Sequence, residues 1–126
     1  MPSALPLRVF LVEDHAWLLE TETLLLEMQD GLTVCGSAGS GEEALETLPD
    51  AVDVVVADLK LPGMNGLDLV RALAERRPDV ACLILSARPA VEVAAAALDA
   101  GAVAYVEKGD GTVLVDALLA CRRSDE

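Results

Sequence analysis

The stretch VDVVVADLKLPG, residues 52–63, indicates the fold more clearly than any other part of the sequence. Its first part, Val52–Ala57, is apolar and mostly β-branched, with one aspartate inside it. Short runs of this kind are typical of strands that are buried on both faces of a parallel sheet. The run ends at Asp58, and a Pro-Gly pair follows at residues 62–63. We therefore predict a central parallel strand with an acidic residue at its carboxyl end and a loop beyond it.

Four further runs extend this pattern on both sides. Leu7–Val12 and Ala81–Leu85 also predict central strands, whereas Thr33–Ser37 and Ala104–Val106 are weaker and predict strands at the sides of the sheet. Between the runs, apolar residues recur at helical spacing, and Val91–Ala100 consists mainly of strong helix formers. Strict alternation predicts an α/β fold: a doubly wound, five-stranded parallel sheet with five helices on both faces.

Composition limits the class of protein. The chain has 126 residues, 53% of them hydrophobic, and a formal net charge of −13. Such an apolar content excludes a disordered acidic tail, and charges interrupt every run that could span a membrane. The N-terminus has no pattern of a secretory signal, so we expect a cytoplasmic protein with packed, reduced thiols at Cys35, Cys82 and Cys121. The acidic balance argues against direct nucleic-acid binding by this domain.

Polar residues mark the ends of the predicted strands, where ligands bind in such sheets. Five of them directly follow a strand or come shortly after one: Glu13, Asp14, Asp58, Ser86 and Lys108. Three carboxylates at one edge repel one another unless a divalent cation neutralises them, and hard oxygen ligands favour Mg²⁺. A hydroxyl and an ammonium add the donor and the positive charge that a phosphoryl group requires. The pattern therefore predicts phosphoryl transfer onto an aspartate.

Taken singly, each of these residues has an ordinary structural explanation. Asp and Ser are common in turns and at helix starts, and a lone Lys is most often a solvated surface charge. We interpret His15, beside the acid pair, as a turn residue, and we expect Trp17 to pack or to line the rim of the acidic pocket. The joint placement of the five residues at successive strand ends is what favours a site.

Two enzyme classes with related sheets fit the sequence less well. A haloacid-dehalogenase-type phosphatase needs a second Asp two residues after its nucleophile, where this chain has Lys60. A flavodoxin binds FMN through a hydroxyl- and glycine-rich loop after the first strand and through aromatic rings. This chain has Glu13 and Asp14 at that loop and only 2% aromatic residues, so both classes are disfavoured.

Four segments together resemble the response-regulator receiver domain, the CheY-like phosphoacceptor of two-component signalling, over essentially the whole chain. The segments are Val12–His15 (VEDH), Asp58–Gly66 (DLKLPGMNG), Ile84–Ala87 (ILSA) and Gly101–Lys108 (GAVAYVEK). The style is most similar to the NarL/FixJ type, and the resemblance implies a flavodoxin-like strand order of 2-1-3-4-5. Lys108 precedes Gly109 instead of the usual proline, so we expect a trans peptide there, since a non-proline cis bond costs about 3 kcal/mol.

The resemblance also implies a role for each matching residue. Asp58 would accept the phosphoryl group, Ser86 would hydrogen-bond it, and Tyr105 would change rotamer in response. Lys108 would pair with Asp58 beforehand and contact the phosphoryl oxygen afterwards. Mg²⁺, with Mn²⁺ as an alternative, would be held by the side chains of Glu13, Asp14 and Asp58 and by the backbone carbonyl of Lys60.

The same resemblance implies the partners of the domain. A histidine kinase or phosphotransfer protein would supply the phosphoryl group, and the domain would catalyse only its own phosphorylation and dephosphorylation, without being a metabolic enzyme. The face formed by the fourth helix, fifth strand and fifth helix would act on an output domain, a target protein or a second copy. We interpret residues 1–126 as one receiver domain, with a DNA-binding output domain expected beyond it. A receiver-like interaction module that never carries phosphate is the alternative.

Overall fold

The structure is a computed structural model, and it describes residues 5–109 and 111–124. Five strands alternate with five helices along the described chain. The strands are β1 (Leu7–Val12), β2 (Leu32–Ala38), β3 (Val54–Asp58), β4 (Ala81–Ser86) and β5 (Ala104–Glu107). The helices are α1 (Ala16–Glu27), α2 (Gly41–Thr47), α3 (Gly66–Arg76), α4 (Ala90–Ala100) and α5 (Thr112–Ser124).

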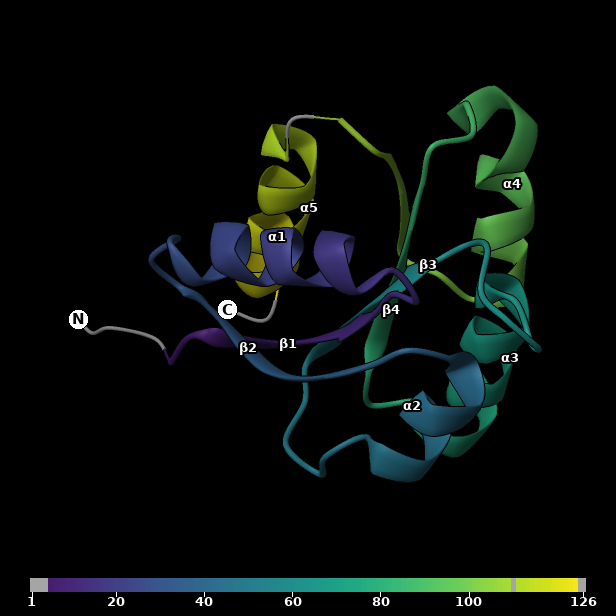
Figure 1. Ribbon diagram of the computed structural model, residues 1–126, viewed down its shortest axis with the longest axis horizontal. Coiled ribbons are helices and arrows are strands. Elements are labelled where there is room, and N and C mark those ends of the chain that lie inside the picture. The colour runs from purple at the N-terminus through teal and green to yellow at the C-terminus, as the bar shows by residue number, and fades with distance from the viewer. Residues whose placement is uncertain (1–4, 110, 125–126) are drawn as a thin grey trace.

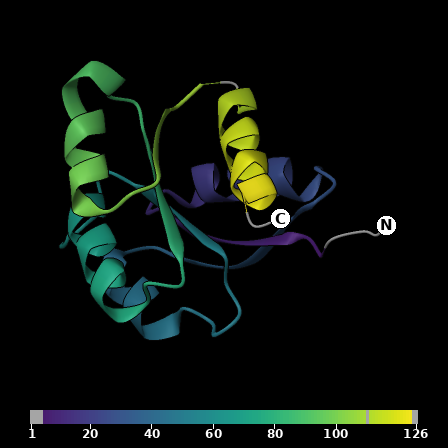
Figure 2. The ribbon, with the colours of Figure 1, turned by 180° about the vertical axis from the view of Figure 1, so that it is seen from behind.

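All five strands form one parallel sheet in the order β2-β1-β3-β4-β5. Figures 1 and 2 show α1 and α5 side by side on one face of the sheet and α2, α3 and α4 on the other. The predicted doubly wound fold and its strand order are therefore confirmed. No helix in the part of the chain that the structure describes is long and apolar enough to cross a membrane.

The core has two parts, one on each face of the sheet. One cluster of buried residues, which includes Phe10 and Ile84, lies under α2, α3 and α4. The other includes Leu11, Leu26 and Leu83 and lies under α1 and α5. Successive residues of a strand point to opposite faces, so both faces of the central strands are apolar, as the unbroken runs predicted. Cys82 is buried and Cys35 and Cys121 are partly buried, which agrees with the expectation of packed thiols.

Four of the five strands differ from the predicted ones by one or two residues at an end. β3 begins at Val54 instead of Val52. Asp53 before it lies in a bend, and its side chain accepts a hydrogen bond from the Arg8 backbone N–H (2.8 Å). At their carboxyl ends β2, β3, β4 and β5 each run one residue further than predicted, whereas β1 has the predicted bounds. Asp58 pairs with Leu85, and Ser86 pairs with Glu107. Polar side chains are thus held by the sheet itself.

The start of α3 is fixed against the end of β3. Asn65 and Asp68 form a reciprocal capping box, in which each side chain accepts a hydrogen bond from the backbone N–H of the other (2.9 and 3.2 Å). The N–H of Gly66 donates to the Leu59 carbonyl (2.9 Å). A Cβ at Gly66 would lie 2.4 Å from the Asp58 carbonyl oxygen, so only glycine allows this close approach. The helix therefore fixes the backbone that carries Asp58.

Candidate functional site

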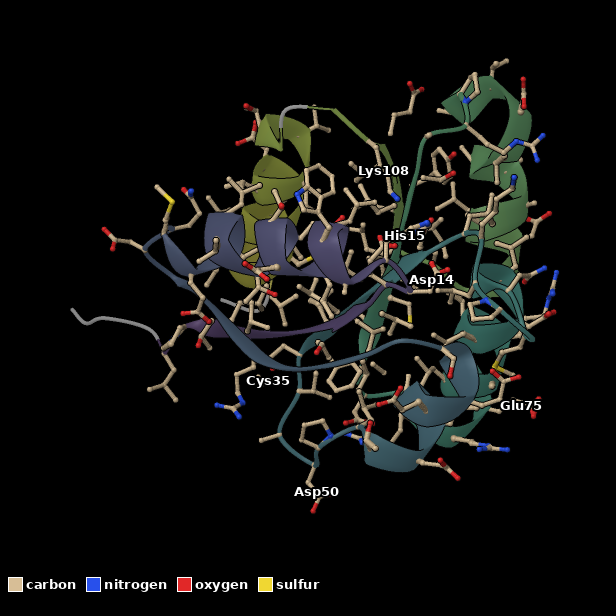
Figure 3. The ribbon with its side chains drawn as sticks, in the orientation of Figure 1. Asp14, His15, Cys35, Asp50, Glu75 and Lys108 are labelled. Atoms are coloured by element: carbon tan, nitrogen blue, oxygen red, sulfur yellow. The ribbon has the colours of Figure 1, made fainter. Side chains whose placement is uncertain are left out.

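The five polar residues predicted to converge do lie at one edge of the sheet. Asp58 and Ser86 are the last residues of β3 and β4, and both are buried. Glu13 and Asp14 come directly after β1, and Lys108 comes directly after β5. Figure 3 shows Asp14 and Lys108 pointing into the same region above the strand ends. The edge is hollowed into an open pocket of about 890 Å³, whose lining includes Asp14, Asp58, Ser86 and Lys108.

Lys108 links the two buried carboxylates of the site. Its Nζ lies 3.1 Å from Asp58 Oδ2 and 3.4 Å from Glu13 Oε1. Its backbone N–H donates to the Ser86 carbonyl (2.8 Å), which extends the β4–β5 ladder and fixes where the side chain starts. No peptide bond among the described residues is cis, so the Lys108–Gly109 bond is trans, as expected. The ammonium therefore reaches Asp58 without the proline typical of the family.

The electrostatics of the pocket favour an additional cation. Burial raises the pKa of Asp58, and the charge of Glu13 raises it further. The hydrogen bond and charge of Lys108 and the backbone N–H of Lys60 lower that pKa, but they do not outweigh the burial. Burial lowers the pKa of Lys108, whereas the surrounding carboxylates, Asp58 first among them, raise it above its usual value. One ammonium among several carboxylates leaves the site with excess negative charge.

The acid pair after β1 has the chemistry of a divalent cation site. Ligand atoms of Glu13, Asp14 and His15 all lie within 4.8 Å of one another. The Nδ1 atom of His15 is 3.3 Å from Glu13 Oε2 and 3.4 Å from Asp14 Oδ1. Carboxylate oxygens suit Mg²⁺, and Asp58 and Lys60 line the adjoining pocket. The donor set at this edge therefore fits a Mg²⁺ ion.

Of the two residues singled out after the acid pair, one lies as expected and one does not. His15 lies at the turn before α1, where it is the N-cap residue, and its ring also lies against both acids and lines the pocket. Trp17 is 74% exposed and is not among the residues that line the pocket, so the expectation that it packs or lines the rim is wrong. The reason is rotation along α1, which turns Trp17 to the side of the helix opposite the buried Leu26.

A chain of hydrogen bonds joins Ser86 to the outer face of the domain. The Ser86 Oγ accepts from the Arg88 N–H (3.1 Å), and the Tyr105 hydroxyl donates to the Arg88 carbonyl (2.5 Å). The carboxylate of Glu107 accepts from the Ala90 N–H at the start of α4 (2.8 Å). The loop between β4 and α4 is thus held from both sides, by β4 through Ser86 and by β5 through Tyr105 and Glu107.

The bond made by Glu107 was not predictable from sequence, because it joins residues on different elements. Pro89 at the N-cap of α4 makes no side-chain capping bond, and Glu107 supplies an acceptor for the helix from the neighbouring strand instead. A similar long-range bond holds the loop after β3, where Glu42 Oε2 accepts from the Met64 N–H (3.1 Å). Local patterns of sequence carry no signal for such partners.

A further acid close to the site, Glu22 on α1, was also missed. Burial, and then the charge of Glu13, raise the pKa of Glu22 from 4.5 to about 7, although the charge of Lys108 lowers it. Its folded-state pKa thus exceeds its unfolded value, so folding is favoured at low pH and this advantage is lost as the pH rises through 7. The ionised form of Glu22 therefore destabilises the native state.

We expect Glu22→Gln to stabilise the domain at about pH 8 but not at about pH 5, with a differential effect of about 1–2 kcal/mol after allowance for solvent screening. Urea unfolding of both proteins at the two pH values measures the effect. Glu20→Gln is the matched control, because Glu20 lies on the same helix and is exposed. Equal changes in unfolding free energy for both variants would show that the burial of Glu22 has no such cost.

The chain resembles known proteins over most of its length. Residues 9–119 match the response regulator receiver domain, and the chain therefore belongs to that family. The chain is 43% identical over 102 residues to the DNA-binding transcriptional activator DevR/DosR of Mycobacterium tuberculosis. The aligned segment covers 80% of this chain and 47% of that protein. The chain is 35% identical over 122 residues to the nitrate/nitrite response regulator protein NarP of Escherichia coli, which covers 95% and 57%.

Solved structures give the same result. A two-component response regulator of the LuxR family from Aurantimonas sp. has a TM-score of 0.84 and 31% identity, over 94% of this chain and 86% of that one. With GacA and UvrY also among the relatives, the similarity to regulators of the NarL/FixJ type is confirmed. The chain is thus a signalling domain, and receiver domains bind Mg²⁺ at an acidic pocket of this kind. It spans about half the length of the curated relatives it matches.

Proposed function

We propose that this domain accepts a phosphoryl group on Asp58 in a Mg²⁺-dependent reaction and thereby switches an output surface. The observation that carries this proposal is the contact of the Lys108 ammonium with Asp58 Oδ2 and Glu13 Oε1, at the wall of an open pocket that Ser86 also lines. A nucleophilic carboxylate, a fixed cation and a hydroxyl donor are the groups that phosphoryl transfer onto an aspartate requires.

The residues of the pocket would have separate roles in the reaction. The side chains of Glu13, Asp14 and Asp58 and the carbonyl of Lys60 would hold the ion, with Mn²⁺ as an alternative to Mg²⁺. When bound, the ion supplies positive charge that offsets the charge of the transferring group. An Asp58 carboxylate oxygen attacks the phosphorus in line with the leaving group of the donor, and the bond from phosphorus to the donor breaks. Lys108 then pairs with a phosphoryl oxygen instead of the carboxylate.

The conformational change would reach the output surface through the loop after β4. Ser86 Oγ now accepts from the Arg88 N–H, and it would donate its own hydrogen to a phosphoryl oxygen once Asp58 is modified. Movement of that loop would break the bond between Tyr105 and the Arg88 carbonyl, so Tyr105 would change rotamer and alter the α4-β5-α5 face. Residues of three elements would then present a different surface to a partner.

The relatives suggest what surrounds the domain in its whole protein. DevR/DosR is a DNA-binding transcriptional activator, and this chain covers 47% of it. We infer that residues 1–126 form a receiver that acts in the cytoplasm on a DNA-binding output domain beyond it, with the domain itself making no contact with DNA. A histidine kinase or phosphotransfer protein would be the donor, and a second copy of the domain is a candidate partner for the switched face. Its only catalysis would be its own phosphorylation and dephosphorylation.

Incubation with acetyl phosphate tests the proposed reaction without a kinase. We expect intact-mass analysis to show one phosphoryl adduct per chain when Mg²⁺ is present and at least a tenfold slower reaction when EDTA removes it. A donor phosphoprotein should give the same adduct. If neither donor modifies the folded protein with Mg²⁺ present, the alternative of a phosphate-independent interaction module is correct.

A further inference from the structure

A second cavity lies on the other side of Lys108, between α1 and the end of β5. Its volume is about 190 Å³, and its walls are mainly apolar, with Leu18 and Leu25 from α1 and Leu85 and Leu114 from β4 and α5. Lys108 lines this cavity as well as the phosphate pocket. The Lys108 side chain therefore lies between the two cavities. A charged group in one cavity acts on a lysine that also lines the other.

Glu22 is the acid that lines this second cavity from α1. Its side chain makes no hydrogen bond or ion pair with any residue in the described ranges 5–109 and 111–124, although it is partly buried. A carboxyl group in an apolar wall without a partner is costly to ionise. That cost keeps the pKa of Glu22 at about 7, so the group gains and loses its charge near neutral pH.

The charged groups around Glu22 come from three strand ends. They are Glu13 after β1, Asp58 at the end of β3, and Glu107 and Lys108 at the end of β5. Asp116 of α5 lines a separate cavity beside Gln29. Lys108 is therefore the cation among these neighbours that responds to Glu22, and the charge of Glu22 in turn contributes to the raised pKa of Lys108.

We propose that Glu22 is a positioning residue for Lys108: its ionised carboxylate draws the ammonium toward α1 and away from Asp58, and protonation of Glu22 returns the ammonium to the phosphate pocket. This rests on the proposed function, since it concerns the lysine of the same site. The ionised form also adds negative charge close to the incoming phosphoryl group. Phosphorylation of Asp58 would then be favoured by a fall in pH through neutrality, which makes the receiver responsive to protons as well as to its donor.

The coupling of the two residues can be measured without any phosphorylation. In carbon-13 NMR of the side-chain carboxyl groups, Glu22 should titrate with a midpoint near 7. Lys108→Ala should raise the Glu22 midpoint by about half a pH unit or more, because it removes the nearby positive charge. A Glu22 midpoint below about 5, or one that Lys108→Ala leaves unchanged, would overturn the proposal.

The consequence for the reaction needs a rate measured at two pH values. With acetyl phosphate and saturating Mg²⁺, Glu22→Gln should form the adduct about threefold faster than the wild type at about pH 8 and at an equal rate at about pH 6. Because the two proteins are compared at the same pH, the ionisation of acetyl phosphate affects both rates equally. Glu20→Gln should match the wild type at both values. A ratio for Glu22→Gln that is the same at both pH values contradicts the proposal, whereas a wild type that forms no adduct contradicts the proposed function and leaves the NMR result to decide the coupling.

Discussion

Asp58→Asn is expected to abolish the phosphoryl adduct, with a residual rate at least a thousandfold below that of the wild type. The amide cannot act as the nucleophile, and it also withdraws one carboxylate oxygen from the acidic edge. Intact-mass analysis after incubation with acetyl phosphate and Mg²⁺ measures the loss. Because burial raises the pKa of Asp58, its ionised form opposes folding at neutral pH, so the variant should be at least as stable as the wild type.

Asp99→Asn is the control for this prediction. Asp99 is exposed near the end of α4 and lies outside the phosphate pocket, so this variant should react like the wild type. An adduct that persists in folded Asp58→Asn would mean that another group accepts the phosphoryl. Peptide mapping would then identify it, and the role proposed for the Lys108–Asp58 contact would be wrong.

The sequence predicts the sheet and its functional edge because both depend on local patterns. A run such as Val52–Ala57 is apolar on both faces, and only a central parallel strand buries both faces of a run of this length. Strands of this type all point the same way, so polar residues that follow them meet at one edge without any knowledge of tertiary contacts. The convergence of Glu13, Asp58 and Lys108 follows from chain direction alone.

The features that the sequence does not predict depend on the distance between elements. Glu22 and Trp17 occupy the same helix, and their sequence neighbours do not distinguish the one that faces Lys108 from the one that is exposed. The helix is apolar on several sides, so its hydrophobic pattern does not define a single buried face. The hydrogen bond of Glu107 is equally unpredictable from sequence, because its donor is the backbone N–H of Ala90 on α4. Such contacts are set by how α1, α4 and β5 pack against one another.

Gly66→Ala should lower the free energy of unfolding by about 2 kcal/mol and slow phosphorylation about tenfold. An alanine Cβ would lie 2.4 Å from the Asp58 carbonyl oxygen and 3.0 Å from the Leu59 Cα, both backbone atoms. Replacing glycine with alanine in a helix contributes about 1 kcal/mol of stability, but forced overpacking costs about 1–3 kcal/mol, and a rigid backbone places this site at the upper end. Urea unfolding measures the first effect, and the rate of adduct formation measures the second.

Gly109→Ala separates the close approach at Gly66 from the general effect of removing a glycine. A Cβ at Gly109 meets no atom within 4 Å, so this variant should change the unfolding free energy by less than about 1 kcal/mol. The tenfold slower reaction of Gly66→Ala has a distinct cause, because the clash pushes on the carbonyl of Asp58 itself and shifts the nucleophile from its line of attack. If Gly66→Ala were as stable and as reactive as Gly109→Ala, the contact between α3 and β3 would not be what positions Asp58.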